Sequence, residues 1–240
     1  MAGILIALQF LTRFPIRNGE TARRQISESY YFYPVIGFLI GVTAVMLRRI
    51  LTTVFPVPFS ITLVLGFLIW ITGGLHEDGL ADVADGMGGG YTPDERLRIM
   101  KDSRIGAFGT AALILALLAK YSALTSMHPA RLDASIVAAH TLGRWIFLPV
   151  GFFNRPARGG LGSEFMKGIT AKAVVISTMI AISAVTLLCR MRGAFAVTIA
   201  IVISAVTSAY LRRRLGGITG DCFGAIFQLV EIGTYAVFLA

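Results

Sequence analysis

The chain has 240 residues, of which 55% are hydrophobic and only 15% are charged, and its mean hydropathy is +0.74. An average soluble domain has about 25% charged residues, so this composition excludes an ordinary soluble protein and predicts an all-α polytopic membrane protein. The formal net charge of +9 comes mainly from bases between apolar segments, which makes a nucleic-acid partner a poor explanation for it.

The first segment, MAGILIALQFLTRFPI, is apolar but too short to cross a bilayer. Its large apolar side chains recur at helical spacing, while Gln9 and Arg13 fall elsewhere on the helical wheel. We therefore expect a helix that lies in the membrane interface. A helix packed against the rest of the protein explains the same pattern equally well. The apolar positions are Ile4, Leu5, Leu8 and Leu11.

Seven later windows are apolar enough to cross a hydrocarbon core of about 30 Å, which takes about 20 helical residues. The chain shows no internal repeat, low-complexity tract or linker, so we expect a single domain. About seven transmembrane helices are predicted, over residues 31–47, 59–75, 106–127, 134–153, 173–189, 193–211 and 220–239.

Lys and Arg residues are distributed unevenly between these windows. The segments on one side of the predicted bundle carry 15 of them, and those on the other side carry 5. The positive-inside rule places the richer side in the cytoplasm, so we expect a cytoplasmic N-terminus and an external C-terminus. The segment before the first window contributes Arg13, Arg17, Arg23 and Arg24 to the richer side.

An acidic stretch, HEDGLADVADG, follows the second window. Asp78, Asp82 and Asp85 share one face if the helix continues through them, because their spacing is i, i+4 and i+7. Three close carboxylates near a helix C-terminus repel one another, and a divalent cation removes that conflict. An oxygen-only ligand set suits Mg²⁺ or Mn²⁺. The glycines at 88–90 are expected to end this helix. A solvated acidic loop is the alternative.

The next stretch begins with a helix-start pattern, in which Thr92 is the N-cap, Pro93 the first residue and Glu95 the end of a capping box. We expect this helix to run from 93 to about 104. It would bring Arg98, Lys101 and Asp102 within about a turn of each other, and such a mixture of bases and a carboxylate suits a phosphate ester. Asp221 opens the last window on the same predicted cytoplasmic side as Asp102.

Ionisable residues inside the windows are costly in lipid and should face the interior of the bundle. His140 and Arg144 share a face at i, i+4, and Asp221, Gln228 and Glu231 share one on the last window. Arg144 and Glu231 both fall near mid-membrane, where a buried ion pair and a role in substrate binding are both open. Lys120 is the remaining base of this set.

Three stretches together closely resemble the cobalamin synthase family, the adenosylcobinamide-GDP ribazoletransferases: HEDGLADVADG, IMKDSRIGAFG and GGITGDCFGA. The N-terminal ALQFLTRFPI and the YFYPVIGFLIGV of the first window are similar to the family too, so the resemblance covers nearly the whole chain. A looser likeness to CDP-alcohol phosphotransferases does not fit the spacing of the acids.

The resemblance implies a polytopic membrane enzyme of late adenosylcobalamin synthesis, with Mg²⁺ as cofactor and one membrane-embedded catalytic domain over residues 1–240. It implies the cell inner membrane as location. The uneven distribution of Lys and Arg places the acids, and with them the expected active site, on the cytoplasmic side. The 3′-hydroxyl of α-ribazole, or of its 5′-phosphate, would attack the phosphorus attached to cobinamide in adenosylcobinamide-GDP, and GMP would leave. The expected partners are these substrates and the lipid bilayer, without nucleic acid, and a homo-oligomer is left open.

The resemblance also implies roles for individual residues. Metal and diphosphate handling falls to Asp78, Asp82, Asp85, Asp102 and Asp221, and the catalytic carboxylates are expected among Asp82, Asp85 and Asp102. The candidate substrate-binding residues are Lys101, Arg104, Arg13, Arg144 and Glu231.

Two positions depart from the family pattern. Glu77 stands where we expect an apolar residue, so we give it no catalytic role. Gln228 stands where we expect an acid, which leaves open whether that face of the last helix binds anything. A cation-coupled transporter is the alternative from another class, but it would place its acids near mid-membrane and often shows paired halves. A scaffold protein has no feature in its favour beyond the number of spans.

Overall fold

The computed structural model describes residues 2–14 and 27–240, and these residues form helices joined by loops, with one isolated bridge between Pro156 and Ile218. Among them, five helices are long and apolar enough to cross a membrane, and the number rises to six if a sharply bent pair counts as one span. The prediction of an all-α membrane protein is confirmed at this level. Arg17, Arg23 and Arg24, which entered the charge count, lie outside the described residues.

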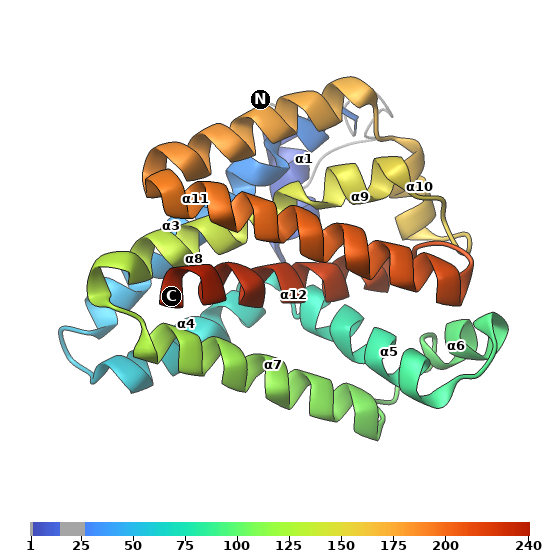
Figure 1. The fold of residues 1–240 in the computed structure, drawn as a ribbon, viewed down its shortest axis with the longest axis horizontal. Coiled ribbons are helices and arrows are strands. Elements are labelled where there is room, and N and C mark those ends of the chain that lie inside the picture. Colours follow the sequence, from blue (N-terminus) through green and yellow to red (C-terminus); the bar gives the residue numbers. More distant parts are fainter. Residues whose placement is uncertain (1, 15–26) are drawn as a thin grey trace.

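Figure 1 shows α6, α10 and the first turn of α12 at one end of the bundle and the C-terminus at the other. The described elements, in chain order, are α1 Ala2–Leu11, η1 Tyr30–Phe32, α3 Tyr33–Leu51, α4 Val57–Thr72, α5 Leu75–Gly89, α6 Pro93–Ile99, α7 Ala107–Ser126, α8 Pro129–Trp145, α9 Phe147–Phe153, α10 Leu161–Lys167, α11 Ala171–Leu215 and α12 Gly220–Leu239.

A two-glycine break separates the second apolar window from the acidic stretch. Gly73 and Gly74 have φ values of 68° and 71°, a left-handed conformation that glycine adopts readily, and the chain turns by 88° between α4 and α5. The expectation that one helix continues from the apolar window through the acids was therefore wrong. The three aspartates nevertheless share a helix, because all of them lie within α5.

The element α11 doubles back on itself (Figure 1). Arg190 has non-helical dihedral angles, φ 52° and ψ −129°, and it divides the 45 residues of α11 into two arms. A Cβ atom at Gly193 would lie 2.5 Å from the carbonyl oxygen of Val185, so the arms pack closely beside the turn. The break falls between the predicted windows 173–189 and 193–211.

The helix α8 lies at the centre of the bundle, since 83% of the most apolar window in Pro129–Phe153 is buried. Small residues let neighbouring backbones approach it, as is usual between membrane helices. A Cβ atom at Gly37 of α3 would collide with the carbonyl of His140, and one at Gly41 would lie 2.7 Å from the Cα of Val137.

The helix α1 packs against the rest of the protein. Ala7 and Leu11 are buried in its contact face, and the backbone N–H of Arg13 donates to the carbonyl of Ile71 at 2.9 Å. Of the two alternatives for this segment, the structure supports the packed helix.

The capping box that opens α6 is confirmed. The Thr92 hydroxyl accepts from the Glu95 backbone N–H, and the Glu95 carboxylate accepts from the backbone N–H groups of Tyr91 and Thr92. The helix ends at Ile99, however, and not at about 104. Lys101, Asp102 and Arg104 therefore lie in the loop that leads to α7.

Candidate active site

A close contact between α5 and α12 brings acids from the two helices together. A Cβ atom at Gly79 would lie 2.6 Å from the carbonyl oxygen of Asp221, so the two backbones touch at this point. Asp78 and Asp82, next to Gly79 and one turn beyond it, are close enough to Asp221 for the three carboxyl groups to interact electrostatically. The chain folds this way because only a residue without a side chain fits at the crossing.

Arg158 is the base that reaches this group of acids. Its Nη2 donates to Asp221 Oδ2 at 3.1 Å, and its Nη1 donates to the carbonyl of Leu97 in α6 at 2.9 Å. The hydroxyl of Thr219, the N-cap of α12, also donates to Asp221 Oδ2 at 3.1 Å. Sequence analysis missed Arg158 as a site residue, because only the folded loop after α9 carries it to Asp221.

Asp85 has a different environment. Its two carboxylate oxygens accept from the backbone N–H groups of Gly106 at 2.7 Å and Gly109 at 2.8 Å, which form the start of α7. An acid at a helix N-terminus satisfies unpaired N–H groups and interacts favourably with the helix dipole. A Cβ atom at either glycine would collide with the Asp85 carboxylate. Asp85 thus joins the end of α5 to the beginning of α7.

The exposed loop before α7 carries Asp102 and Arg104 as a two-contact ion pair. Arg104 donates from Nε to Oδ1 at 3.0 Å and from Nη2 to Oδ2 at 2.7 Å. The Arg104 side-chain hydrogen bonds, helped by its backbone N–H and charge, lower the pKa of Asp102 to about 2. With Asp85, the pair lines an open pocket of about 280 Å³. Lys101 is exposed beside it.

The donor chemistry of the α5–α12 contact fits a hard divalent cation. In the described part of the chain, the side chains of Asp78 and Asp82 form no hydrogen bond or ion pair with another residue, and oxygen donors of this kind suit Mg²⁺. No three His, Cys, Asp or Glu side chains of the described residues stand close enough to hold one ion together. A cation at this contact would therefore be held by at most two of the carboxylates of Asp78, Asp82 and Asp221.

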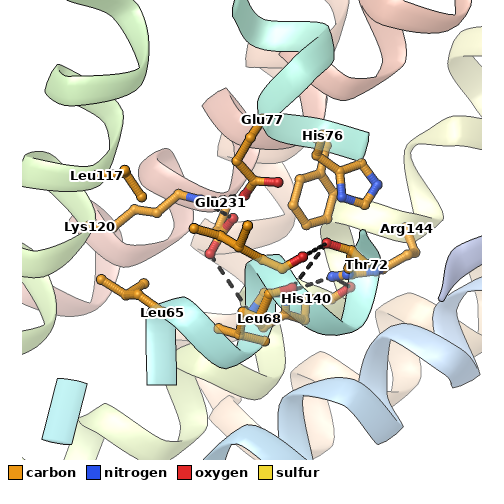
Figure 2. Close-up of a pocket in the computed structure, with 12 residues that line it drawn as sticks. Leu65, Leu68, Thr72, His76, Glu77, Leu117, Lys120, His140, Arg144 and Glu231 are labelled. Carbon is orange, nitrogen blue, oxygen red and sulfur yellow. Dashed lines mark hydrogen bonds and ion pairs between the residues drawn. The ribbon is translucent and has the colours of Figure 1, made fainter. Parts of the chain in front are cut away.

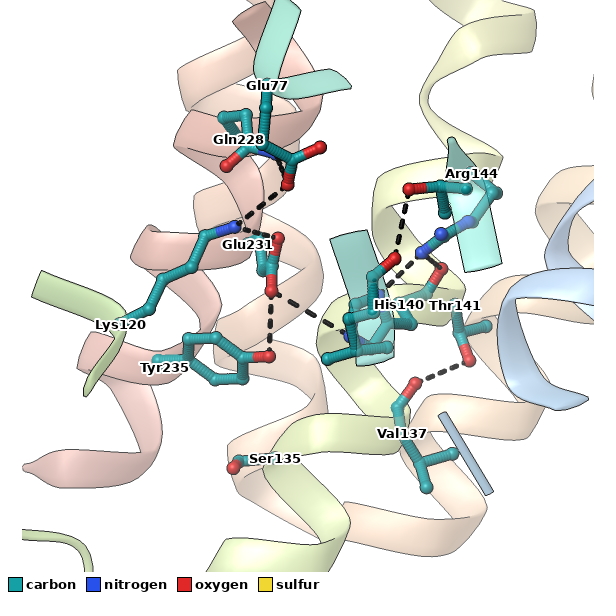
Figure 3. A network of polar contacts seen from close by, with 12 residues as sticks. Glu77, Lys120, Ser135, Val137, His140, Thr141, Arg144, Gln228, Glu231 and Tyr235 are labelled. Atoms are coloured by element: carbon teal, nitrogen blue, oxygen red, sulfur yellow. Dashed lines mark hydrogen bonds and ion pairs between the residues drawn. The ribbon is translucent and has the colours of Figure 1, made fainter. Parts of the chain in front are cut away.

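A second polar cluster lies deep in the bundle (Figure 3). Lys120 Nζ is 2.7 Å from Glu231 Oε2, and the hydroxyl of Tyr235 donates to Glu231 Oε1 at 2.9 Å. Arg144 Nη1 lies 2.6 Å from His140 Nδ1, and its guanidinium carbon is 4.5 Å from the centre of the Phe227 ring. The shared face of His140 and Arg144 is confirmed.

A direct ion pair between Arg144 and Glu231, one of the two expectations from sequence, does not form. Glu231 instead takes Lys120 as its partner, from α7, and Arg144 turns to His140 on its own helix. Hydropathy placed both residues at similar depth, but it carries no information on which neighbouring helix each one faces.

The two positions that depart from the family pattern are bonded to each other. Gln228 Nε2 donates to Glu77 Oε1 at 2.8 Å, and Glu77 Oε1 is 3.9 Å from Lys120 Nζ. The acid expected at position 228 is thus replaced by Glu77, which comes from α5 instead of α12. Arg13, predicted to bind substrate, lies with its guanidinium carbon 5.2 Å from the centre of the Trp70 ring, near the α4–α5 break.

Comparisons with known proteins add a match along nearly the whole chain. Residues 3–239 match the family model described as cobalamin-5-phosphate synthase. Three similar curated proteins are named adenosylcobinamide-GDP ribazoletransferase. That of Vibrio vulnificus strain YJ016 is 33% identical over 243 residues, which cover 98% of this chain and 94% of the relative. Those of Shewanella baltica strain OS185 and Vibrio cholerae strain O395 are 32% and 34% identical, each covering 98% of this chain and 92% of the relative. No solved structure matches the chain.

Proposed function

The chain belongs to the cobalamin-5-phosphate synthase family, and from this premise we propose that it is an adenosylcobinamide-GDP ribazoletransferase. The reaction joins adenosylcobinamide-GDP to α-ribazole, or to its 5′-phosphate. The products are adenosylcobalamin, or its 5′-phosphate, and GMP. This completes the nucleotide loop of the cofactor in cobalamin biosynthesis.

The observation that supports the chemistry is the contact between α5 and α12, with three carboxylates and one guanidinium around it. The ribose 3′-oxygen forms a bond to the phosphorus attached to cobinamide, and the bond from that phosphorus to the GMP oxygen breaks. In-line positioning and stabilisation of charge on the phosphoryl oxygens supply most of the acceleration of such a reaction. Mg²⁺ held by Asp78 and Asp221 would neutralise charge on the diphosphate.

The side chains near the metal site have separate tasks in this proposal. Asp82 takes the proton of the attacking hydroxyl, because it is coupled electrostatically to Asp78, Asp85 and Asp221 and is free of hydrogen bonds to other described residues. Arg158, at the edge of this group, donates to phosphoryl oxygens. The exposed bases of the loop before α7, Lys101 and Arg104, bind the outer phosphate.

We further propose seven spans in the cell inner membrane. The two arms of α11 count as two of them, and the bent pair of α4 and α5 counts as one. The end of the bundle with α6 and α10 then faces the cytoplasm, together with the proposed site (Figure 1). The family match over nearly the whole chain gives no support to the alternative of a cation-coupled transporter.

The test is an assay of the purified protein in detergent with adenosylcobinamide-GDP, α-ribazole and Mg²⁺. We expect release of GMP in equal amount to the cobalamin formed, and loss of both products when a chelator removes the metal. A protein that forms neither product with α-ribazole or with its 5′-phosphate would contradict the proposed function. Full turnover in excess chelator would contradict the metal site alone.

A further inference from the structure

The core of the bundle brings together two acids and two bases from four helices: Glu77 of α5, Lys120 of α7, Arg144 of α8 and Glu231 of α12 (Figure 3). The Glu77 side chain is half-buried, with 16% of it exposed. The side chains of Lys120 and Glu231 are 3% and 2% exposed, and Arg144 is completely buried. With neutral imidazoles at His76 and His140, the formal charges of the four groups sum to zero. Loss of either acid would leave an uncompensated base in a medium where such a charge is costly.

Glu77 is the member of this network that joins it to the candidate active site. Oε1 accepts from Gln228 of α12 at 2.8 Å and lies 3.9 Å from Lys120 of α7. Oε2 is buried without a hydrogen-bond partner among the described residues, as are Nε and Nη2 of Arg144. Glu77 and Arg144 line the same small cavity (Figure 2). One side chain thus connects α5 to α7, α12 and the cavity beside α8.

The helix α5 needs such an anchor because of the break that precedes it. Because Gly73 and Gly74 adopt left-handed conformations, the orientation of α4 does not fix the rotation of α5 about its own axis. Successive residues of a helix differ by about 100° around the axis. A shift of α5 by one position would therefore carry Asp78 and Asp82 away from Asp221. Asp85 holds the C-terminal part of α5 against the start of α7. Glu77 lies at the other end, in the first turn of α5.

We propose that Glu77 is a positioning residue. Its carboxylate, held by Gln228 and Lys120, fixes the rotation of α5 and so sets Asp78 and Asp82 against Asp221. Glu77 itself touches neither substrate nor metal. The consequence for catalysis rests on the proposed function, whereas the consequence for the position of α5 does not.

The hydrogen bond between Glu77 and Gln228 allows an exchange experiment. Three variants are compared with the native protein: Glu77→Gln, Gln228→Glu, and the double variant that carries both changes. The first removes the carboxylate and the second places two carboxylates face to face, whereas the double variant restores one carboxylate and one amide with their positions exchanged. Glu164→Gln on α10, an exposed acid outside both polar clusters, is the matched control.

Two readouts are measured on each protein. Hydrogen exchange of the backbone amides in α5 reports its anchoring without any need for activity. The Mg²⁺ concentration for half-maximal GMP release reports the placement of the carboxylates. We expect both single variants to exchange faster in α5 and to need about 10- to 100-fold more Mg²⁺, as for other residues that orient metal ligands. The double variant should return both values to within about threefold of the native ones.

Native exchange in α5 of Glu77→Gln, or a double variant no better than the single ones, would overturn the proposal. If the single variants fail to fold, a double variant that folds with native exchange supports it, and a double variant that fails too overturns it. A native protein without transferase activity would contradict the proposed function, and the exchange data would still decide whether Glu77 anchors α5.

Discussion

The aspartates of α5 are alike in sequence but differ in what their oxygens already bind. Asp85 accepts two backbone hydrogen bonds from the start of α7, whereas Asp78 and Asp82 form none with the described residues. A carboxylate with two N–H partners contributes to stability, and a carboxylate without partners is available for a cation or a proton. The same helix face therefore combines a structural acid with two that are suited to chemistry.

Replacement of these acids should separate the two tasks. We expect Asp82→Ala to abolish GMP release and to leave the thermal unfolding midpoint in detergent nearly unchanged. Asp85→Ala should lower that midpoint, since the loss of a helix cap costs about 0.5–2 kcal/mol. The two measurements on each variant are the midpoint and the rate of GMP release. A clear loss of stability in Asp82→Ala, with native activity, would refute the assignment.

Asp102 should titrate far from the range of an ordinary carboxyl group. Arg104 lowers its pKa from the usual 3.8 to about 2, so the pair contributes stability above pH 3.8 and loses that contribution as the pH falls toward 2. In Arg104→Ala we expect the pKa of Asp102 to rise toward 3.8. Carbon NMR of labelled aspartate gives both values. Because the pair is exposed, added salt should reduce the difference, and an unchanged pKa in the variant would contradict the pairing.

At the scale of elements, the molecule depends on backbone contact between α5 and α12. The gap at Gly79 is too narrow for a side chain, because the atom that a Cβ would meet is the carbonyl oxygen of Asp221, 2.6 Å away. Backbone moves only with the whole helix, so a methyl group there must push the two helices apart.

Gly79→Ala should therefore lower stability and activity more than the small size of the added methyl group suggests. We expect a loss of about 1–3 kcal/mol of stability, as for other overpacked sites, and a fall in GMP release. Gly66→Ala in α4 is the control, since a Cβ atom at Gly66 meets nothing within 4 Å. The measurements are the unfolding midpoints and GMP-release rates of the two variants. Equal values for Gly79→Ala and Gly66→Ala would show that α5 and α12 can move apart without loss of stability.

Sequence predicted those parts of the elements that depend on local chemistry. The capping box at Thr92 and the end of α5 in its glycines both follow from nearby residues, as does the shared face of His140 and Arg144. The sequence did not reveal the break at Gly73 and Gly74, because glycine is tolerated within apolar helices and only tertiary contacts decide whether it bends them.

The sequence predicted which acids belong to the candidate site, but it did not predict the residues to which they bond. Helical spacing predicted that Asp78, Asp82 and Asp85 share a helix, but hydrogen bonds assign Asp85 to the start of α7. Arg158 entered the sequence analysis only as part of a charge count, because its contact with Asp221 spans 63 positions along the chain. Local patterns cannot encode contacts at that separation.

At the scale of the whole molecule, the two ends of the bundle differ in what they carry. Tyr91, after α5, and Gly216, after α11, lie at the end that holds α6 and α10. The start of α8, which carries Arg131, and the turn within α11, which is at Arg190, lie at the opposite end, near the C-terminus (Figure 1). A membrane that crosses the bundle would separate these two pairs.

Labelling of introduced cysteines in intact cells should show the orientation. We expect an impermeant thiol reagent added from outside to modify a cysteine placed near Arg131 or Arg190, and to spare one placed near Tyr91 or Gly216. Lysed cells serve as the control, in which all four positions should react. The reverse pattern in intact cells would place the proposed site on the outside.

The hydrogen bond between Glu77 and Gln228 has a consequence for how relatives of this protein diverge. A carboxylate on either helix can serve the same neighbours, so the acid can change places between positions 77 and 228 over the course of evolution. Each single replacement on the way alters the charge of a buried cluster by one unit. Lineages should therefore exchange the two residues together. Each position considered alone should vary more than the combination of one acid and one amide at the two positions.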